Sequence, residues 1–145
     1  MHETADVKIT NQSGTPLAKF VMWHWASSAP DISPGREIVH AGPVPERGVV
    51  NAVAAQMPLA MDYWAVAIAI PGDANVYVLQ GGDQPYKDFE VAPLGTIYVT
   101  IGSVGQGSGT VSITYEDSVT SVRLVPLSQF PGNDAAAAIA QAMKS

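Results

Sequence analysis

Residues 62–70 alternate between large and small apolar side chains. With a period of two, one face is formed by Trp64, Val66, Ile68 and Ile70, and the other by Tyr63, Ala65, Ala67 and Ala69. Because both faces are apolar, the pattern predicts a central strand that is covered on both sides. A helix is the alternative, since alanine favours helices, but the β-branched residues here alternate instead of recurring every third or fourth position.

Similar alternation, broken by turn residues, marks the other strands that we expect. They lie at residues 7–10, 17–25, 36–40, 49–55, 76–79, 86–91, 96–101, 110–115 and 119–125. Pro43 and Pro45 indicate an edge or a connection, because proline cannot donate to a sheet ladder. Residues 27–35 are expected to form a loop, and the glycine-rich residues 102–109 a loop between strands.

The pattern changes after residue 132. Asn133 or Asp134 can cap a short alanine-rich helix over residues 135–144, with Lys144 near its carboxyl end. Regularly spaced short strands predict an all-β fold, an antiparallel β-sandwich of about eight to ten strands over residues 1–132. Residues 133–145 form a helical tail that packs on the sandwich, packs on a neighbouring subunit, or frays.

Composition and charge limit the classes of function that the chain can have. The chain has 145 residues, 47% hydrophobic and 14% charged, with a formal net charge of -6, so one domain is expected. Its seven basic residues are scattered, which argues against a nucleic-acid partner. The chain has no cysteine, and its first residues do not resemble a signal peptide. No run is long enough for a membrane-spanning helix, and the location in the cell stays open.

Catalytic and metal-binding patterns are weak. His2, His24 and His40 have no ligand spacing, and a structural role is expected for His24 and His40. The glycine-rich run precedes a strand, whereas phosphate loops precede a helix. Acidic turn residues could offer calcium ligands, but they show no regular spacing. No Gly-x-Ser-x-Gly elbow occurs. We therefore predict a protein without catalytic residues, metal or cofactor, and so no enzyme.

Aromatic side chains are the strongest indication of function. Trp23 and Trp25 share one face of their strand, with His24 on the other, and Tyr86 lies beside a turn. Trp64 is expected in the core. For Trp23 and Trp25 the pattern leaves burial and exposure open, because Phe20 and Met22 compete for the interior. An exposed pair would suit sugar stacking, a lipid surface or a subunit interface.

Several short stretches are similar to aegerolysins and related haemolysin-like β-sandwich proteins. They are residues 7–14, the Trp23-x-Trp25 pair, residues 32–35 and residues 109–115. The alanine-rich residues 51–69 and the helix after Asn133 depart from the family pattern. The resemblance implies a small sandwich that binds membrane lipid through surface aromatics.

The predicted function is a non-catalytic binding module that recognises a membrane lipid or a glycan. Trp23, Trp25 and Tyr86 are the predicted ligand-binding residues. The first alternative is a structural or self-assembling subunit whose apolar faces are buried in a homo-oligomer. The second is a metal-dependent hydrolase, which would need His24 or His40 to meet carboxylates in a cleft.

Overall fold

A computed structural model describes residues 4–26, 37–55, 62–88 and 95–144. Its elements in chain order are β1 (Thr4–Asn11), β2 (Leu17–Ala26), β3 (Glu37–Val44), β4 (Val49–Ala55), β5 (Asp62–Ala69), β6 (Tyr77–Leu79), β7 (Lys87–Asp88), β8 (Thr96–Gly105), β9 (Ser108–Tyr115), β10 (Ser118–Pro126), η1 (Leu127–Gln129) and α1 (Asp134–Met143). The predicted β-rich chain with a short C-terminal helix is confirmed. The predicted loop at 27–35 lies outside the described residues, as do residues 89–91 of the predicted strand at 86–91, whose residues Lys87 and Asp88 form β7.

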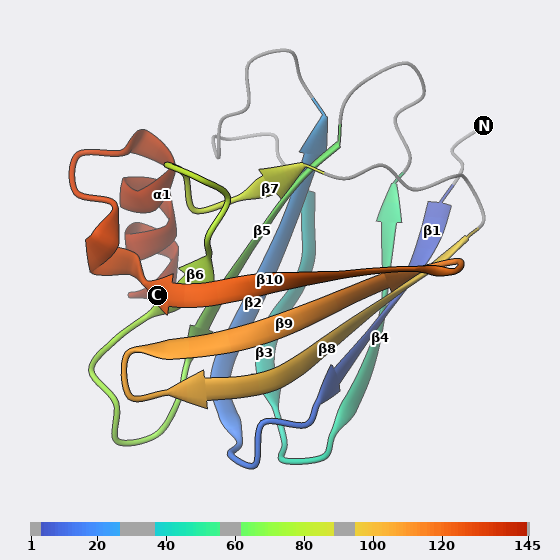
Figure 1. The fold of residues 1–145 in the computed structure, drawn as a ribbon, viewed down its shortest axis with the longest axis horizontal. Coiled ribbons are helices and arrows are strands. Elements are labelled where there is room, and N and C mark those ends of the chain that lie inside the picture. The colour runs from blue at the N-terminus through green and yellow to red at the C-terminus, as the bar shows by residue number, and fades with distance from the viewer. Residues whose placement is uncertain (1–3, 27–36, 56–61, 89–94, 145) are drawn as a thin grey trace.

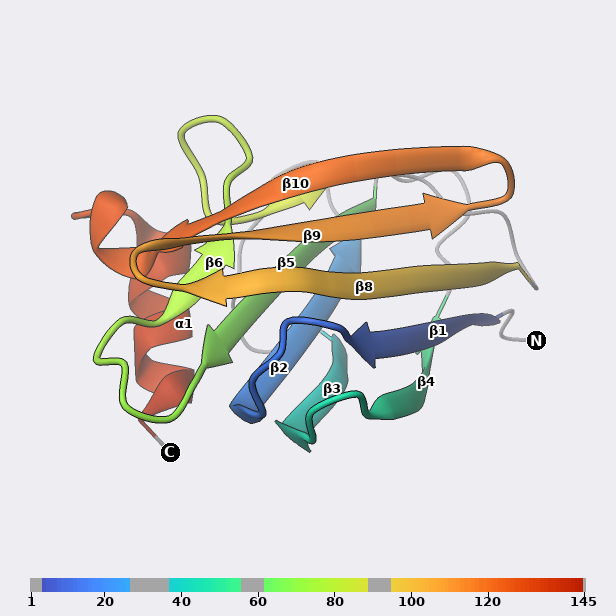
Figure 2. The same cartoon turned by 60° about the horizontal axis from the view of Figure 1, so that its bottom comes forward.

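The strands form one curved sheet, not the two facing sheets of a sandwich (Figures 1 and 2). Their order is β3-β2-β5-β6-β10-β9-β8-β1-β4, and β7 pairs with β5. The sheet is mixed, because β1 runs parallel to β8 while its other neighbour, β4, is antiparallel. The sandwich prediction is therefore wrong in detail. Because β1 pairs with both β8 and β4, all the strands belong to one sheet, which is nearly closed into a barrel.

Large apolar side chains fill the interior of this barrel. Trp64, Val66 and Ile68 of β5 point inward, where they join Phe20 and Met22 of β2 in one buried cluster. Further inward residues come from β1, β6, β8, β9 and β10. The predicted core position of Trp64 is confirmed, since its side chain is fully buried.

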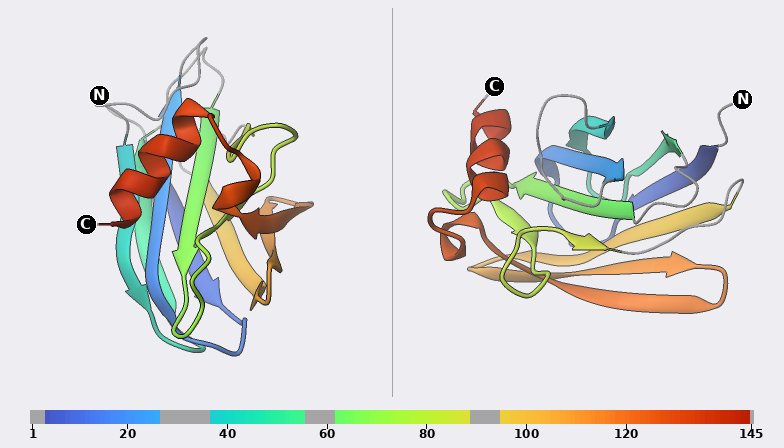
Figure 3. Two further views of the ribbon diagram at one scale, coloured as in Figure 1. Left: turned by 90° about the vertical axis from the view of Figure 1, so that its left-hand side faces the viewer. Right: turned by 90° about the horizontal axis from the view of Figure 1, so that it is seen from above.

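Helix α1 covers the outer face of β2 and β5 (Figure 3). Ile139 of the helix packs in a second buried cluster that contains Trp23 of β2 and both Ala65 and Ala67 of β5. Alanines on β5 leave room for a helix to approach the sheet closely. The predicted burial of both faces of β5 is thus confirmed, and of the three outcomes expected for the tail, packing on the sheet is the one observed.

A side chain forms a hydrogen bond with the backbone at each end of α1. The carboxamide oxygen of Asn133 accepts a hydrogen bond from the backbone N–H of Ala136 at 3.0 Å, as expected of an N-cap. At the other end, Lys19 Nζ donates to the carbonyl oxygen of Ala142 at 3.0 Å. A lysine on β2 therefore meets the negative end of the helix dipole and ties the helix to the sheet.

The glycine-rich residues 102–109 are strand and turn, so the predicted long loop is wrong. Strand β8 continues to Gly105, β9 begins at Ser108, and only Gln106 and Gly107 connect them. Their φ angles of 55° and 85° are typical of a two-residue hairpin turn. Gly109 is packed so closely that a Cβ there would collide with the Ser103 carbonyl. These glycines therefore serve turn geometry and close strand packing.

Asn11 closes one end of the barrel. Its fully buried side chain donates to the carbonyls of Thr15 at 2.8 Å and Pro45 at 3.2 Å. Its carboxamide oxygen accepts from the backbone N–H and the hydroxyl of Ser13, at 3.0 and 2.6 Å. One side chain thus joins the β1–β2 connection to the β3–β4 connection, although these lie far apart in the sequence.

Replacing Asn11 with Ala should lower the free energy of unfolding by about 2–4 kcal/mol, because several buried polar groups lose their partners together. Ser13→Ala is the matched control and should cost about 1 kcal/mol, since Asn11 keeps its other bonds. Urea unfolding monitored by circular dichroism measures both. Equal small effects would contradict a joining role for Asn11.

Tyr77 connects two turns at the same end of the sheet. Its hydroxyl donates to Asp73 Oδ2 at 2.6 Å and accepts from the backbone N–H of Gly107 at 2.9 Å. Asp73 Oδ1 also accepts from the backbone N–H of Asn75 at 2.9 Å. The hydrogen bond from Tyr77, followed by that from Asn75, lowers the pKa of the Asp73 carboxyl below its ordinary value of 3.8.

This lowered pKa predicts a pH dependence of stability. Folding favours the Asp73 carboxylate, so its contribution is complete above pH 3.8 and is lost as the pH falls through the folded-state pKa. Asp73→Asn should therefore destabilise the protein at neutral pH, and the difference from wild type should shrink below pH 3.8. Urea unfolding across this range measures it. A difference that does not change with pH would contradict the assignment.

Candidate functional site

Trp23 and Trp25, two of the predicted ligand-binding residues, are buried. Trp23 is 0% exposed and Trp25 is 7% exposed. They do lie on one face of β2, with His24 on the other, but that face is covered by α1 and by neighbouring aromatic rings. Of the two arrangements that the sequence left open, the structure has the buried one.

Tyr86, the third predicted residue, belongs to a cluster of three rings with Trp25 and Tyr63. Trp25 is stacked on Tyr63, with centroids 5.9 Å apart and planes at 20°. Tyr86 presents an edge-to-face contact to each, at 5.4 Å from Trp25 and 5.9 Å from Tyr63. These geometries are favourable for aromatic pairs. Trp25 is the buried base of the cluster, and the two tyrosines are half-buried.

Strand register creates this cluster. Trp25 pairs with Tyr63 across β2 and β5, and Tyr63 pairs with Asp88 across β5 and β7. Paired residues in neighbouring strands point to the same face, so these three side chains form a row. Tyr86 precedes β7 directly and reaches the same row from the connection between β6 and β7.

A cavity of about 230 Å³ opens beside the two tyrosines. We call it the Tyr63–Tyr86 pocket; its lining residues are Tyr63, Gly81, Gln84, Tyr86, Lys87 and Asp88. Lys87 pairs with the inward-pointing Trp64, so its side chain leaves β7 on the face opposite to Tyr63 and Asp88. Aromatic faces therefore meet a carboxamide and a carboxylate in one small space. This combination can bind a ligand that has both an apolar face and hydroxyl groups.

Two buried polar atoms at the pocket and its base lack hydrogen bonds. Within the described part of the chain, neither Gln84 Oε1 nor Trp25 Nε1 has a partner. One is an acceptor and the other a donor, and buried groups of this kind are nearly always paired. Gln84 lines the pocket, so a ligand hydroxyl could donate to its Oε1, whereas Trp25 lies outside the lining, packed against the two tyrosines.

The hairpin beside the pocket requires a glycine. Gly81 and Gln84 exchange backbone hydrogen bonds of 2.9 and 3.3 Å across this short turn. A Cβ at Gly81 would collide with the carbonyl of Tyr86. The absence of a side chain at Gly81 therefore lets the backbone of Tyr86 approach and sets the position of its ring.

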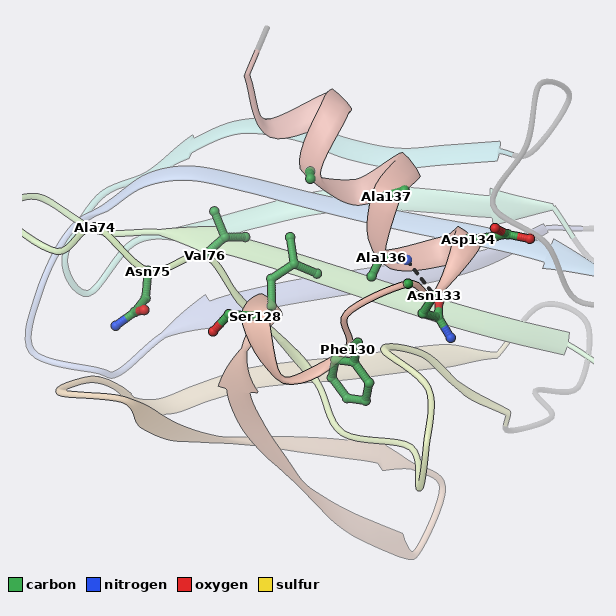
Figure 4. Close-up of a pocket in the computed structure, with 12 residues that line it drawn as sticks. Ala74, Asn75, Val76, Ser128, Phe130, Asn133, Asp134, Ala136 and Ala137 are labelled. Atoms are coloured by element: carbon green, nitrogen blue, oxygen red, sulfur yellow. Dashed lines mark hydrogen bonds between the residues drawn. The ribbon is translucent and has the colours of Figure 1, made fainter.

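A larger open groove of about 610 Å³ lies beside the first turns of α1 (Figure 4). Val76, Phe130 and Ala136 contribute apolar surface, and Asn75 and Ser128 lie at its rim. The carboxamide oxygen of Asn133 already accepts a hydrogen bond from the backbone N–H of Ala136. The groove exists because the helix presents alanines there; most of its lining residues are apolar, and its polar side chains, which include Asp134, meet no pair of tyrosine rings.

His24 and His40, the two histidines in the described ranges, lie apart and form no metal centre there. His24 lies in the barrel interior, where its Nδ1 is 3.3 Å from Glu37 Oε1 and its ring lies 4.3 Å from that of Trp64. His40 packs near Phe20 instead, with ring centroids 5.9 Å apart. Across residues 4–26, 37–55, 62–88 and 95–144, no group of three potential ligands could hold a metal ion. No helix in those ranges is long and apolar enough to cross a membrane.

The chain matches no protein-family model, and a search of curated proteins finds no match either. The resemblance to aegerolysins therefore stays a prediction. Its Asn11-x-Ser13 motif has a structural role in this chain, because Asn11 and Ser13 bond to each other in a turn.

Sequence reasoning found one of the residues that line the pocket, Tyr86, and missed its partners. Tyr63 was assigned to the small face of the central strand, and Lys87 and Asp88 belong to a strand of only two residues. Their meeting depends on the pairing of β5 with β7, which residue alternation does not specify. Tyrosine and acidic residues near a glycine turn were the only available signal.

Burial of all three tryptophans predicts blue-shifted fluorescence. Trp23 and Trp64 are 0% exposed, and Trp25 is 7% exposed. Emission should therefore be weakly quenched by iodide and should not shift on adding neutral, sphingolipid-containing or anionic vesicles. A red-shifted spectrum that moves to the blue on one class of vesicle would contradict this burial.

Proposed function

We propose that this protein is a non-catalytic binding module that recognises a glycan in the Tyr63–Tyr86 pocket. The observation that carries the proposal is the meeting of two half-buried tyrosine rings with Gln84, Lys87 and Asp88 around one cavity. The ligand would be a sugar ring at the end of a glycan, because about 230 Å³ is small for a pocket.

Sugar chemistry matches this lining. The apolar face of a pyranose ring packs against aromatic rings, while its hydroxyls need donors and acceptors arranged around the edge. Asp88 would accept from two neighbouring hydroxyls. The unpaired Gln84 Oε1 offers a further acceptor once the ligand or the side chain adjusts.

A glycan is favoured over a lipid surface by the position of the tryptophans. Insertion into a lipid surface needs exposed apolar rings, whereas Trp23 and Trp25 are buried. The side chains around the pocket are mostly polar. Trp25 would act indirectly, as the base on which Tyr63 and Tyr86 rest.

Binding without hydrolysis is favoured by the number of carboxylates. Glycoside hydrolysis generally uses two acidic side chains on opposite sides of the bond. Among the described residues that line the pocket, Asp88 is the only acid. The proposed role is therefore recognition.

A glycan array probed with labelled protein tests the proposal and identifies the sugar, and calorimetry then measures affinity. Tyr86→Ala and Asp88→Asn should each weaken binding at least about tenfold, because each removes a direct contact in a small site. Tyr98→Ala is the matched control, since Tyr98 is an exposed tyrosine on β8 and should bind as wild type does.

Two results would overturn the proposal. One is a folded protein that binds no glycan on the array. The other is equal loss of binding in the Tyr86→Ala and Tyr98→Ala proteins, which would place the ligand elsewhere. Circular dichroism confirms that each variant is folded before its affinity is compared.

A further inference from the structure

The two ends of the strand order, β3 and β4, have very different free edges. They follow each other in the chain and diverge from their connecting turn without pairing (Figure 1). Strand β3 is irregular, with two shifts in its register against β2, and it contains Pro43. Bulges and proline are common protections against pairing with another chain. Strand β4 contains neither feature.

Backbone hydrogen bonds show which groups of β4 face its free edge. Asn11 N–H donates to the carbonyl of Gly48 at 3.0 Å, so these two residues are a hydrogen-bonded pair. On the opposite side of β1, the N–H groups of Asp6 and Gln12 point toward β8, at 3.0 and 2.9 Å from their acceptors. With this alternation, Val50 and Ala52 direct their N–H and C=O groups toward β1. Asn51 and its neighbours two residues away direct theirs outward.

The side chains on the same residues are exposed and uncharged. Val49 is 48% exposed, Val53 is 52% exposed, and Asn51 between them is also exposed. Strand β4 has no charged residue, proline or glycine. An unpaired edge with this composition is able to pair with another strand. Within the described ranges, β4 pairs only with β1.

We propose that β4 pairs antiparallel with β4 of a second copy of this chain, about a two-fold axis at Asn51. Asn51 would then face its own copy, and Val49 would face Val53 of the second molecule. The segment suits this arrangement because Val49 and Val53 lie symmetrically about Asn51. The same outward-pointing backbone groups at Val49, Asn51 and Val53 would form the ladder.

Charge favours a second copy meeting at this strand. Two molecules with a formal net charge of -6 repel each other, so a contact between them needs a surface without carboxylates at its centre. β4 has none, and Asn51 at the axis lies beside Lys8 on β1, whereas the acid of β1, Asp6, lies beside Val53, away from the axis. Two-fold pairing also gives a closed dimer instead of an open fibre, because each β4 edge is used once.

The test uses the absence of cysteine from the chain. Asn51→Cys should form a disulfide-linked dimer under mild oxidation, because paired strands bring the two Cα atoms within disulfide range. Val119→Cys is the matched control, since Val119 is 65% exposed but lies on β10, away from the free edge. It should crosslink far more slowly. Equal rates would overturn the proposal.

Charged substitutions test the register of the proposed β4–β4 pairing. Val49→Lys with Val53→Lys in one protein should give a monomer, because like charges would face each other across the axis. The corresponding double Glu variant should also be monomeric, and mixing the two should restore a dimer. Asn51→Pro should weaken dimerisation while keeping the pairing with β1, since the lost N–H points outward.

Light scattering gives the mass at each step. The wild-type protein should approach twice 15.2 kDa as its concentration rises over a roughly hundred-fold range, as mass action requires. A wild type that stays monomeric throughout would overturn the proposal. So would a dimer that persists in the double Lys variant, or a mixture of Lys and Glu proteins that remains monomeric.

Discussion

The fold depends on β2 and β5, two strands whose apolar side chains project from both faces of the sheet. Such strands are stable only if both faces are covered, because exposed apolar surface is costly. One face is covered by the barrel interior, around Trp64 and Phe20, and the other by α1 and the aromatic cluster. This explains why a short helix of mostly alanine, marginal alone, is held in place. Its support comes from Ile139 against the sheet and from Lys19 at its carboxyl end.

Periodicity predicts which residues face inward, but not which strands pair. The alternation at 62–70 indicated a doubly covered strand, and the structure confirms it. The sandwich prediction failed because the parallel pairing of β1 with β8 is a long-range choice that alternation cannot specify. The loop predicted at 102–109 failed for a local reason. Glycine is common both in turns and where strands pack closely, and only Gln106 and Gly107 form the turn.

The same limit applies to the candidate site. Tyr86 could be named from the sequence because an aromatic residue beside a turn is an evident candidate. Gln84 and Asp88 could not, since their place beside Tyr63 depends on a two-residue strand and a tight hairpin. Burial of Trp23 and Trp25 follows from the helix, whose docking side the sequence left open. Trp25 thus supports Tyr63 and Tyr86 from beneath instead of forming the surface of the pocket, and Trp23 lies in the cluster under α1.

The small number of charged residues bears on both the Tyr63–Tyr86 pocket and the free edge of β4. Only 14% of the residues are charged. The positions where charged groups cluster, and those where they are absent, therefore help to indicate function. Lys87 and Asp88 are adjacent in the lining of the Tyr63–Tyr86 pocket. β4 lacks charge along its whole length, whereas β3 has Glu37 and Pro43. An edge without charge or proline is normally eliminated in a monomer because it invites association. Strand β4 keeps such an edge although β3 has a protected one. This difference agrees with the proposed pairing of β4 with a second copy of the chain.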